Sequence, residues 1–268
     1  MTNASNLEIM GKGEPLVLLH GWPFHKATYR KLMPLLAGRY CCHAINSLGM
    51  TDETLTAQHD LSFEGHARRV GDYIRAQNWD QVTLLAHDTA GTFARLLAAT
   101  EPDLVGRLIL LNTEIPHHRP PFIPLYRALS RLPLFRTSFA LLMRSRTFQR
   151  SAMGFGGCFA DRTFIDDEFI ALFGSYWFAS DTRFQGLIRY LQGIDFSVVD
   201  ALHETHRHIT APVHFIWGAE DKTFPMTLGR QMADRMPSLA GFTPIPGTCF
   251  LPHEERPNAV AEAILAIS

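Results

Sequence analysis

The fold is decided by the stretch Gln81-Val-Thr-Leu-Leu-Ala-His-Asp-Thr-Ala-Gly-Thr-Phe-Ala-Arg-Leu-Leu-Ala-Ala-Thr100. Residues 82–85 form a short apolar run that is typical of a buried strand. Residues 92–100 carry apolar side chains at helical spacing, and the residues between these segments are too few for anything but a tight turn. Small residues at positions 86, 90 and 91 allow the strand and the helix to approach closely. The pattern therefore predicts a strand–turn–helix unit with Asp88 at its exposed apex.

An aspartate at this position has two interpretations. It is a common N-cap residue, because its carboxylate accepts a hydrogen bond from a backbone N–H of the first helical turn. It is also a reactive carboxyl group if other polar motifs follow neighbouring strands of the same sheet. Two such motifs occur later in the chain, which favours the second interpretation.

Length and composition indicate one globular domain, or a core with an inserted segment. The chain has 268 residues, of which 46% are hydrophobic and 19% charged, and its net charge is −1. This balance indicates no general attraction to nucleic acid or to anionic membranes. We see no signal peptide at the start and no apolar run long enough to span a bilayer. The four cysteines form no metal or redox pattern, so we expect reduced thiols and a cytoplasmic protein.

Strands alternate with helices in the first part of the chain and again near its end, which predicts an α/β fold with a mostly parallel central sheet flanked by helices. We expect strands at residues 16–19, 41–45, 82–85, 108–111, 213–217 and 242–245. Between them we expect helices at residues 26–36, 61–77 and 227–236. The alternation stops near residue 116, where Pro-rich sequence begins. We therefore predict a core of residues 1–115 and 206–268, and a helical cap (lid) of residues 116–205 inserted in it, with helices near 125–132, 137–148, 166–178 and 182–192.

Four short motifs stand at predicted strand ends. They are His20-Gly-Trp-Pro23, His87-Asp88-Thr-Ala-Gly91, Gly218-Ala-Glu-Asp221 and Leu251-Pro-His253. Their residues and order resemble the α/β-hydrolase fold family, in which the nucleophile, the acid and the base follow one another in this order. An aspartate at the apex resembles the branch that contains epoxide hydrolases and haloalkane dehalogenases.

The resemblance implies a mechanism. Asp88 would displace a leaving group at saturated carbon and form an alkyl ester, and His253 would activate the water that hydrolyses it. Asp221 would orient His253, and the backbone N–H groups of Trp22 and Thr89 would form the oxyanion hole.

Two other carboxyl groups compete with Asp221 for the role of the acid. Glu220 is its neighbour, and Glu114 follows an earlier strand, where some relatives place the acid. Counting from Asp88, however, the relatives' position falls on Asn112, which favours Asp221.

The leaving group would decide the reaction. A halide needs N–H donors such as Trp22 or Trp177, whereas the alkoxide of an opened epoxide needs hydroxyls, for which Tyr190, Tyr126 and Tyr176 are candidates. Both branches usually carry Trp where this chain has Thr89. We expect an epoxide hydrolase acting on an apolar epoxide, with a haloalkane dehalogenase-type hydrolase as the alternative. A binding protein that has lost catalysis is a third possibility.

We expect no cofactor and no metal, since no carboxylate motif accompanies His203, His206 and His208. The expected partners are an apolar small-molecule substrate and water, with no nucleic acid and no integral membrane segment, in a monomer or a homodimer. The stretch from Arg119 to Arg150 is rich in arginine. We interpret it as the solvated face of amphipathic cap helices, although a membrane surface or an anionic substrate would also suit it.

Overall fold

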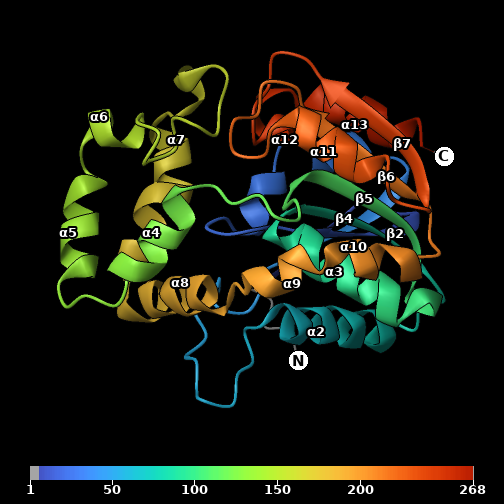
Figure 1. Ribbon diagram of the computed structural model, residues 1–268, viewed down its shortest axis with the longest axis horizontal. Coiled ribbons are helices and arrows are strands. Elements are labelled where there is room, and N and C mark those ends of the chain that lie inside the picture. The colour runs from blue at the N-terminus through green and yellow to red at the C-terminus, as the bar shows by residue number, and fades with distance from the viewer. Residues whose placement is uncertain (1–5, 268) are drawn as a thin grey trace.

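A seven-stranded sheet forms the centre of the molecule (Figure 1). The computed structural model describes residues 6–267. The strands lie in the order β1-β3-β2-β4-β5-β6-β7, and all pairs are parallel except β1 with β3. Their bounds are Leu7–Met10 (β1), Glu14–Leu19 (β2), Tyr40–Ile45 (β3), Val82–Asp88 (β4), Val105–Thr113 (β5), Val213–Gly218 (β6) and Leu239–Ile245 (β7). The sheet confirms the expected α/β-hydrolase architecture.

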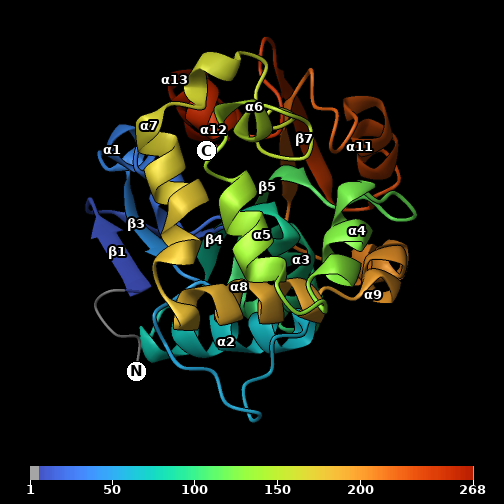
Figure 2. The same cartoon turned by 90° about the vertical axis from the view of Figure 1, so that its left-hand side faces the viewer.

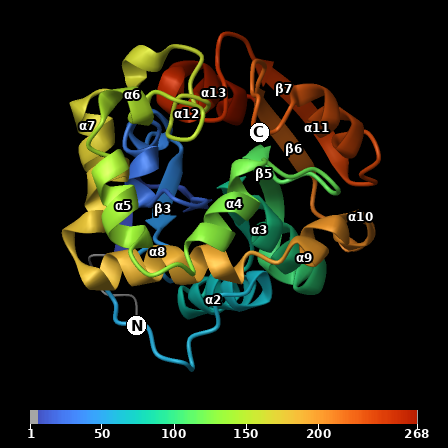
Figure 3. The ribbon, with the colours of Figure 1, turned by 60° about the vertical axis from the view of Figure 1, so that its left-hand side comes forward.

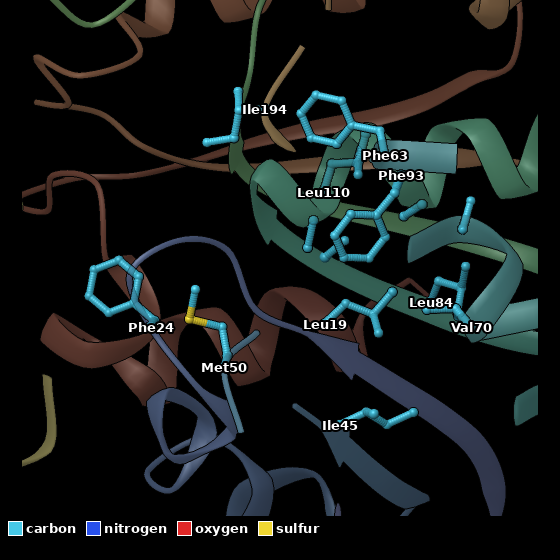
Figure 4. Close-up of a cluster of buried hydrophobic side chains, with 14 of the residues drawn as sticks. Leu19, Phe24, Ile45, Met50, Phe63, Val70, Leu84, Phe93, Leu110 and Ile194 are labelled. Carbon is cyan, nitrogen blue, oxygen red and sulfur yellow. The ribbon is translucent and has the colours of Figure 1, made fainter. Parts of the chain in front are cut away.

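Helices cover both faces of this sheet, because the side chains of its central strands are buried on both sides. On one face, Leu84 packs with the helices α2 (Phe63–Ala76) and α3 (Thr89–Thr100), as the labelled Phe63, Val70 and Phe93 show (Figure 4). On the other face, Leu85 packs with the helices α1 (Met33–Leu36) and α13 (Pro257–Leu265). The remaining core helices are α11 (Met226–Ala233) and α12 (Pro252–Glu255).

A helical insertion, residues 114–212, separates β5 from β6. Its first helices lie to one side of the sheet, and its last ones pack against α3 (Figures 1 and 2). Its helices α4, α5 and α8 are seen together with α9 and α10 in Figure 3. Their bounds are Phe122–Leu129 (α4), Phe135–Leu142 (α5), Arg146–Gln149 (α6), Asp167–Phe169 (α7), Asp181–Gly193 (α8), Phe196–Asp200 (α9) and Leu202–Thr205 (α10). The division into a core and a cap at residues 116 and 205 stays a prediction.

Several expected elements have different bounds. The helix expected over residues 26–36 is a 3₁₀ turn, Lys26–Tyr29, followed by the short α1. The helix expected over residues 137–148 is divided into α5 and α6. The one expected over residues 166–178 contains a π-helical segment, Ile170–Ser175. Strand β1 was not expected, because its residues alternate too briefly to be distinguished from a loop.

Candidate active site at the β4–α3 turn

Asp88 is the last residue of β4 and immediately precedes α3. Its backbone has a positive φ, with φ 57° and ψ −131°, a combination that a residue other than glycine rarely adopts. No side-chain hydrogen bond from Asp88 caps the helix. The simple N-cap interpretation therefore does not hold, and the turn instead holds the Asp88 carboxyl group away from the helix.

Close packing behind the turn explains the small residues of this stretch. A Cβ atom on Gly91 would overlap with the side chain of Thr113 at the end of β5. Arg95, fully buried on α3, donates hydrogen bonds to the carbonyl oxygens of Gly91 at 2.8 Å and Glu114 at 2.9 Å. It also donates to Thr113 Oγ1 at 3.1 Å. These contacts fix the turn against the end of β5.

The Asp88 carboxyl group lies against the loop that follows β2, where a Cβ atom on Gly21 would overlap with it. Burial raises the pKa of Asp88 well above its usual value, and the charge of Glu114 raises this pKa further. Hydrogen bonds from the backbone N–H groups of Thr89 and Trp22 oppose the rise. The two residues expected to form an oxyanion hole thus lie beside the carboxyl group, although the Trp22 N–H also donates to Thr89 Oγ1 at 3.1 Å.

Glu114 provides a second buried carboxyl group at the same site. It follows β5, is 5% exposed, and accepts a hydrogen bond from Thr92 Oγ1. Burial raises the pKa of Glu114 to about 7, with the Thr92 hydrogen bond and the charge of Arg95 acting in the opposite direction. From the sequence, Glu114 is expected only as a competitor of Asp221 for the role of the acid. The sequence signal was present, since carboxyl ends of adjacent parallel strands meet at one edge of a sheet.

Asp221 lies at the same edge, after β6, but it is bound by other groups. Its Oδ2 accepts from Asn112 Nδ2 at 2.7 Å, and its Oδ1 accepts from the backbone N–H of Thr223 at 2.7 Å. Burial raises the pKa of Asp221 to about 7, against these hydrogen bonds. Glu220, its competitor, accepts hydrogen bonds from the backbone N–H groups of Gly247 and Thr248 and thus supports the loop after β7.

The structure does not pair His253 with Asp221, although the His253 ring lies 4.9 Å from the ring of His87, beside Asp88. His253 lies on α12, fully buried, and its Nε2 is 2.8 Å from Thr28 Oγ1. Its Nδ1 has no hydrogen-bond partner among residues 6–267, so it does not bind Asp221. Burial lowers the pKa of His253 well below its usual value.

Phe250, three residues earlier, is the residue of this loop that reaches the site. Its ring lies 4.6 Å from the ring of His87, beside Asp88, and 5.7 Å from the ring of Phe224, beside Asp221. Its backbone oxygen is 2.9 Å from His87 Nε2. An aromatic ring therefore fills the place where we expected an imidazole.

A largely apolar cavity of about 100 Å³ opens in front of Asp88. On its core side, the polar lining consists of two carboxyl groups, Asp88 and Glu114, and two hydroxyl groups, Thr89 and Thr223. The other walls come from the loop after β2, from Phe224 and Phe250, and from the helical insertion, and include Trp22, Phe24, Tyr126, Phe139, Met143, Cys158 and Trp177. Its almost entirely apolar lining suits a small apolar molecule.

Of the expected leaving-group residues, Trp22, Tyr126 and Trp177 line the cavity, whereas Tyr190 and Tyr176 are not among its described lining residues. Tyr190 is buried, with its hydroxyl 3.0 Å from Thr89 Oγ1, because α8 packs it behind that residue. Tyr176 packs instead on His25 and beneath Arg183.

The three lining residues differ in whether their donors are free. The Tyr126 hydroxyl donates to the carbonyl of Met153, and the Trp22 indole donates to that of Leu187 at 3.0 Å. The indole nitrogen of Trp177 is buried and has no hydrogen-bond partner among the residues that the structure describes. Trp177 thus lines the cavity and carries a free N–H donor, but that nitrogen is itself buried behind the cavity wall.

Comparison with known proteins agrees with this architecture. The chain is 29% identical over 162 residues to a haloalkane dehalogenase of Mycolicibacterium paratuberculosis, which is 57% of this chain and 53% of that protein. It is 32% identical over 104 residues to a soluble epoxide hydrolase of a Corynebacterium species, 38% of this chain and 35% of that protein. An α/β hydrolase fold protein from Burkholderia ambifaria superposes with a TM-score of 0.79, at 22% identity over 97% of this chain and 93% of that one.

A sequence profile of the alpha/beta hydrolase fold matches residues 14–257, a range that includes β2, the β4–α3 turn, the helical insertion and the loop after β7. The match covers most of the chain and agrees with the order of the strands. The chain therefore belongs to the α/β hydrolase fold family.

Proposed function

We propose that the protein is a hydrolase that opens small apolar epoxides with water, with Asp88 as the nucleophile and Glu114 as the group that gives and takes the proton. The proposal rests on one observation: two buried carboxyl groups face the same apolar cavity, and the pKa of each is raised. The partial matches to a dehalogenase and an epoxide hydrolase are compatible with it.

Two carboxyl groups in one buried site resist losing both protons, because the second charge would be repelled by the first. The pair therefore keeps one proton over the pH range between its two ionisation steps, and the proposed reaction uses the form in which Asp88 is ionised and Glu114 holds the proton. Epoxide opening needs both forms at once, a carboxylate to attack carbon and an acid to protonate the departing oxygen. A departing halide needs no acid, so the carboxyl pair favours the epoxide.

The cycle balances with these two groups and one water molecule. The Asp88 carboxylate attacks an epoxide carbon, the carbon–oxygen bond breaks, and the Glu114 proton passes to the alkoxide. This step leaves an ester on Asp88 and an ionised Glu114. Glu114 then takes a proton from water, whose oxygen attacks the ester carbonyl carbon. The tetrahedral intermediate then breaks down, its hydroxyl proton passes to the departing oxygen, and the diol leaves with Asp88 ionised and Glu114 protonated, as at the start. The backbone N–H groups of Thr89 and Trp22 would stabilise the oxyanion of the second step.

Diol formation from styrene oxide tests the roles of the two residues. Glu114→Gln keeps the size of the side chain but cannot exchange a proton, so we expect the rate to fall about 10²- to 10⁴-fold. His253→Gln is the matched control, and we expect its rate to stay within a few-fold of the unaltered protein. If His253→Gln is impaired as much as Glu114→Gln, the base is His253 and the proposed role of Glu114 is wrong.

A single turnover in H₂¹⁸O tests the ester on Asp88. The first diol should carry no ¹⁸O, because its new oxygen comes from the Asp88 carboxyl group, and the label should appear in the peptide that contains Asp88. Asp88→Asn should form no diol. Labelled diol in the first turnover would exclude the ester and leave direct attack by water.

The free indole N–H of Trp177 supports a second candidate function, cleavage of a carbon–halogen bond. An N–H donor beside an apolar cavity is the type of group that would hold a departing halide, and the unpartnered indole N–H of Trp177 would serve if the side chain turned it toward the cavity. Bromide release from 1-bromobutane tests this candidate. Trp177→Phe should abolish release, whereas Trp79→Phe, which alters an indole packed on His43 and Tyr73, should not. Absence of bromide release from the unaltered protein would reject it.

A further inference from the structure

The outer surface of the helical insertion combines exposed leucines with arginines. Among the described residues, eight large hydrophobic side chains are exposed, and six of them belong to residues 125–153. These six are Leu125, Leu132, Leu134, Leu141, Leu142 and Met153. Leu134 is 79% exposed and Leu141 66%. A monomeric protein rarely gathers exposed apolar side chains in this way unless they contact something.

The same segment is strongly basic, although the whole chain has a net charge of only −1. Residues 115–160 contain seven arginines and no aspartate, glutamate or lysine. Arg119, Arg136 and Arg146 form ion pairs with Asp200, Asp181 and Asp167 of the same insertion. Arg131, Arg144 and Arg150 are exposed and form no ion pair with any residue in the range 6–267. Positive charge beside the leucines therefore remains uncompensated.

The backbone at Leu134 adds an independent observation. Leu134 precedes α5 with φ 77°, a left-handed conformation that costs a branched residue roughly 1 kcal/mol or more. Its side chain gains almost nothing from burial to offset that cost, since most of it faces solvent. Asparagine or glycine would suit the backbone better, so local stability does not explain a leucine here.

We propose that this surface, residues 125–153 on α4, α5 and the following turns, binds the headgroup region of an anionic lipid membrane. The exposed leucines would enter the boundary between headgroups and acyl chains, and Arg131, Arg144 and Arg150 would bind lipid phosphates. Apolar side chains flanked by arginines complement an anionic bilayer. None of the helices in the described chain is long and apolar enough to cross one, so the contact is peripheral.

The proposed membrane contact lies close to the cavity, which gives the contact a function. The inner sides of the same helices line the cavity through Ile123, Tyr126 and Phe139, while Leu125 and Leu141 face outward. Membrane binding would therefore hold the cavity close to apolar molecules that are dissolved in the bilayer. This step is independent of the reaction that occurs at Asp88.

Co-sedimentation with lipid vesicles tests the proposal. We expect the full chain to bind phosphatidylglycerol vesicles at least tenfold more strongly than phosphatidylcholine vesicles, and to lose this preference in 0.5 M salt. Arg131→Gln, Arg144→Gln and Arg150→Gln should each weaken binding about fivefold, the effect expected for removing one charge near the surface. Equal binding to both vesicle types, or binding to neither, would overturn the proposal.

The variant Leu134→Asn/Leu141→Asn separates insertion of the leucines from simple charge attraction. Asparagine relieves the left-handed backbone at position 134, so the variant should fold normally, yet its binding should fall tenfold or more. Leu35→Gln, at an exposed leucine of α1 outside the insertion, should bind like the unaltered protein. Unchanged vesicle binding by the double variant, or loss of self-association instead of loss of vesicle binding, would show that the leucines serve another contact.

Discussion

Glu114 is the residue whose environment has the clearest measurable consequence. Burial raises its pKa to about 7 from an ordinary value of 4.5, so between these pH values the folded chain keeps a proton that the unfolded chain releases. Its contribution to stability is therefore complete below about pH 4.5 and is lost as the pH rises through about 7. The full effect is up to about 3 kcal/mol.

We predict that the free energy of unfolding falls between pH 5 and pH 8, and that Glu114→Gln reduces this fall by up to about 3 kcal/mol. Asp88 and Asp221 shift in the same direction, so part of the fall should remain in the variant. Chemical denaturation of both proteins at the two pH values measures the difference. An equal fall in the two proteins would mean that Glu114 is ionised without cost in the folded state.

Single residues differ in how far their positions and surroundings can be predicted from the sequence. The position of Asp88 at the turn between β4 and α3 could be predicted because a strand, a tight turn and a helix surround it in one continuous stretch. The role of His253 stays a prediction, because it depends on which residue of a loop faces the cavity, and a loop has no periodicity that shows this. The loop presents Phe250 to the cavity, and α12 carries His253 into the core. Glu114 was visible in the sequence, but its role depends on the burial that only the fold supplies.

At the scale of elements, contact between α3 and β5 outweighs the helix propensity of α3. Alanine in a helix is normally favoured over glycine by about 1 kcal/mol. At Gly91, however, a Cβ atom would overlap with Thr113, a residue that Arg95 and the backbone oxygen of Asp88 already hold. We predict that Gly91→Ala destabilises the protein by about 1–3 kcal/mol, the usual effect of overpacking.

Gly38→Ala is the matched control, because a Cβ atom there meets nothing within 4 Å. It should leave the free energy of unfolding within about 0.5 kcal/mol of the original value. Urea denaturation of the two variants makes the comparison. If Gly91→Ala were as stable as Gly38→Ala, the close approach of α3 to β5 would not determine which residue can occupy position 91.

The elements themselves were predictable to different degrees. The central strands were found because runs such as Leu108–Leu111 are apolar on both faces, which few other structures allow. The helices of the insertion were located only approximately. Their apolar side chains line a cavity on one side and contact solvent on the other, so their periodicity does not mark where each helix ends. The π-helical segment Ile170–Ser175 leaves no sequence signal of its own.

At the scale of the whole molecule, the cavity joins the core to the helical insertion, since residues of both parts form its walls. A ligand that fills it should therefore stabilise the two parts together. At ten times its Kd, a ligand that binds only the folded state adds about 1.4 kcal/mol. For a chain of this size we predict that an inert apolar ligand, toluene, raises the Tm by roughly 3–5 °C.

Gly157→Leu supplies the variant that should not respond to toluene. Gly157 lines the cavity, and a Cβ atom built on it meets nothing within 4 Å, so a larger side chain can occupy free space without displacing the backbone. The variant should fold with a Tm close to that of the unaltered protein, because no packed contact is lost, yet toluene should raise its Tm by less than half as much. Thermal unfolding of both proteins over a series of toluene concentrations measures the effect. Equal shifts would mean that the ligand binds elsewhere, and that the cavity in front of Asp88 is not the site that links the insertion to the core.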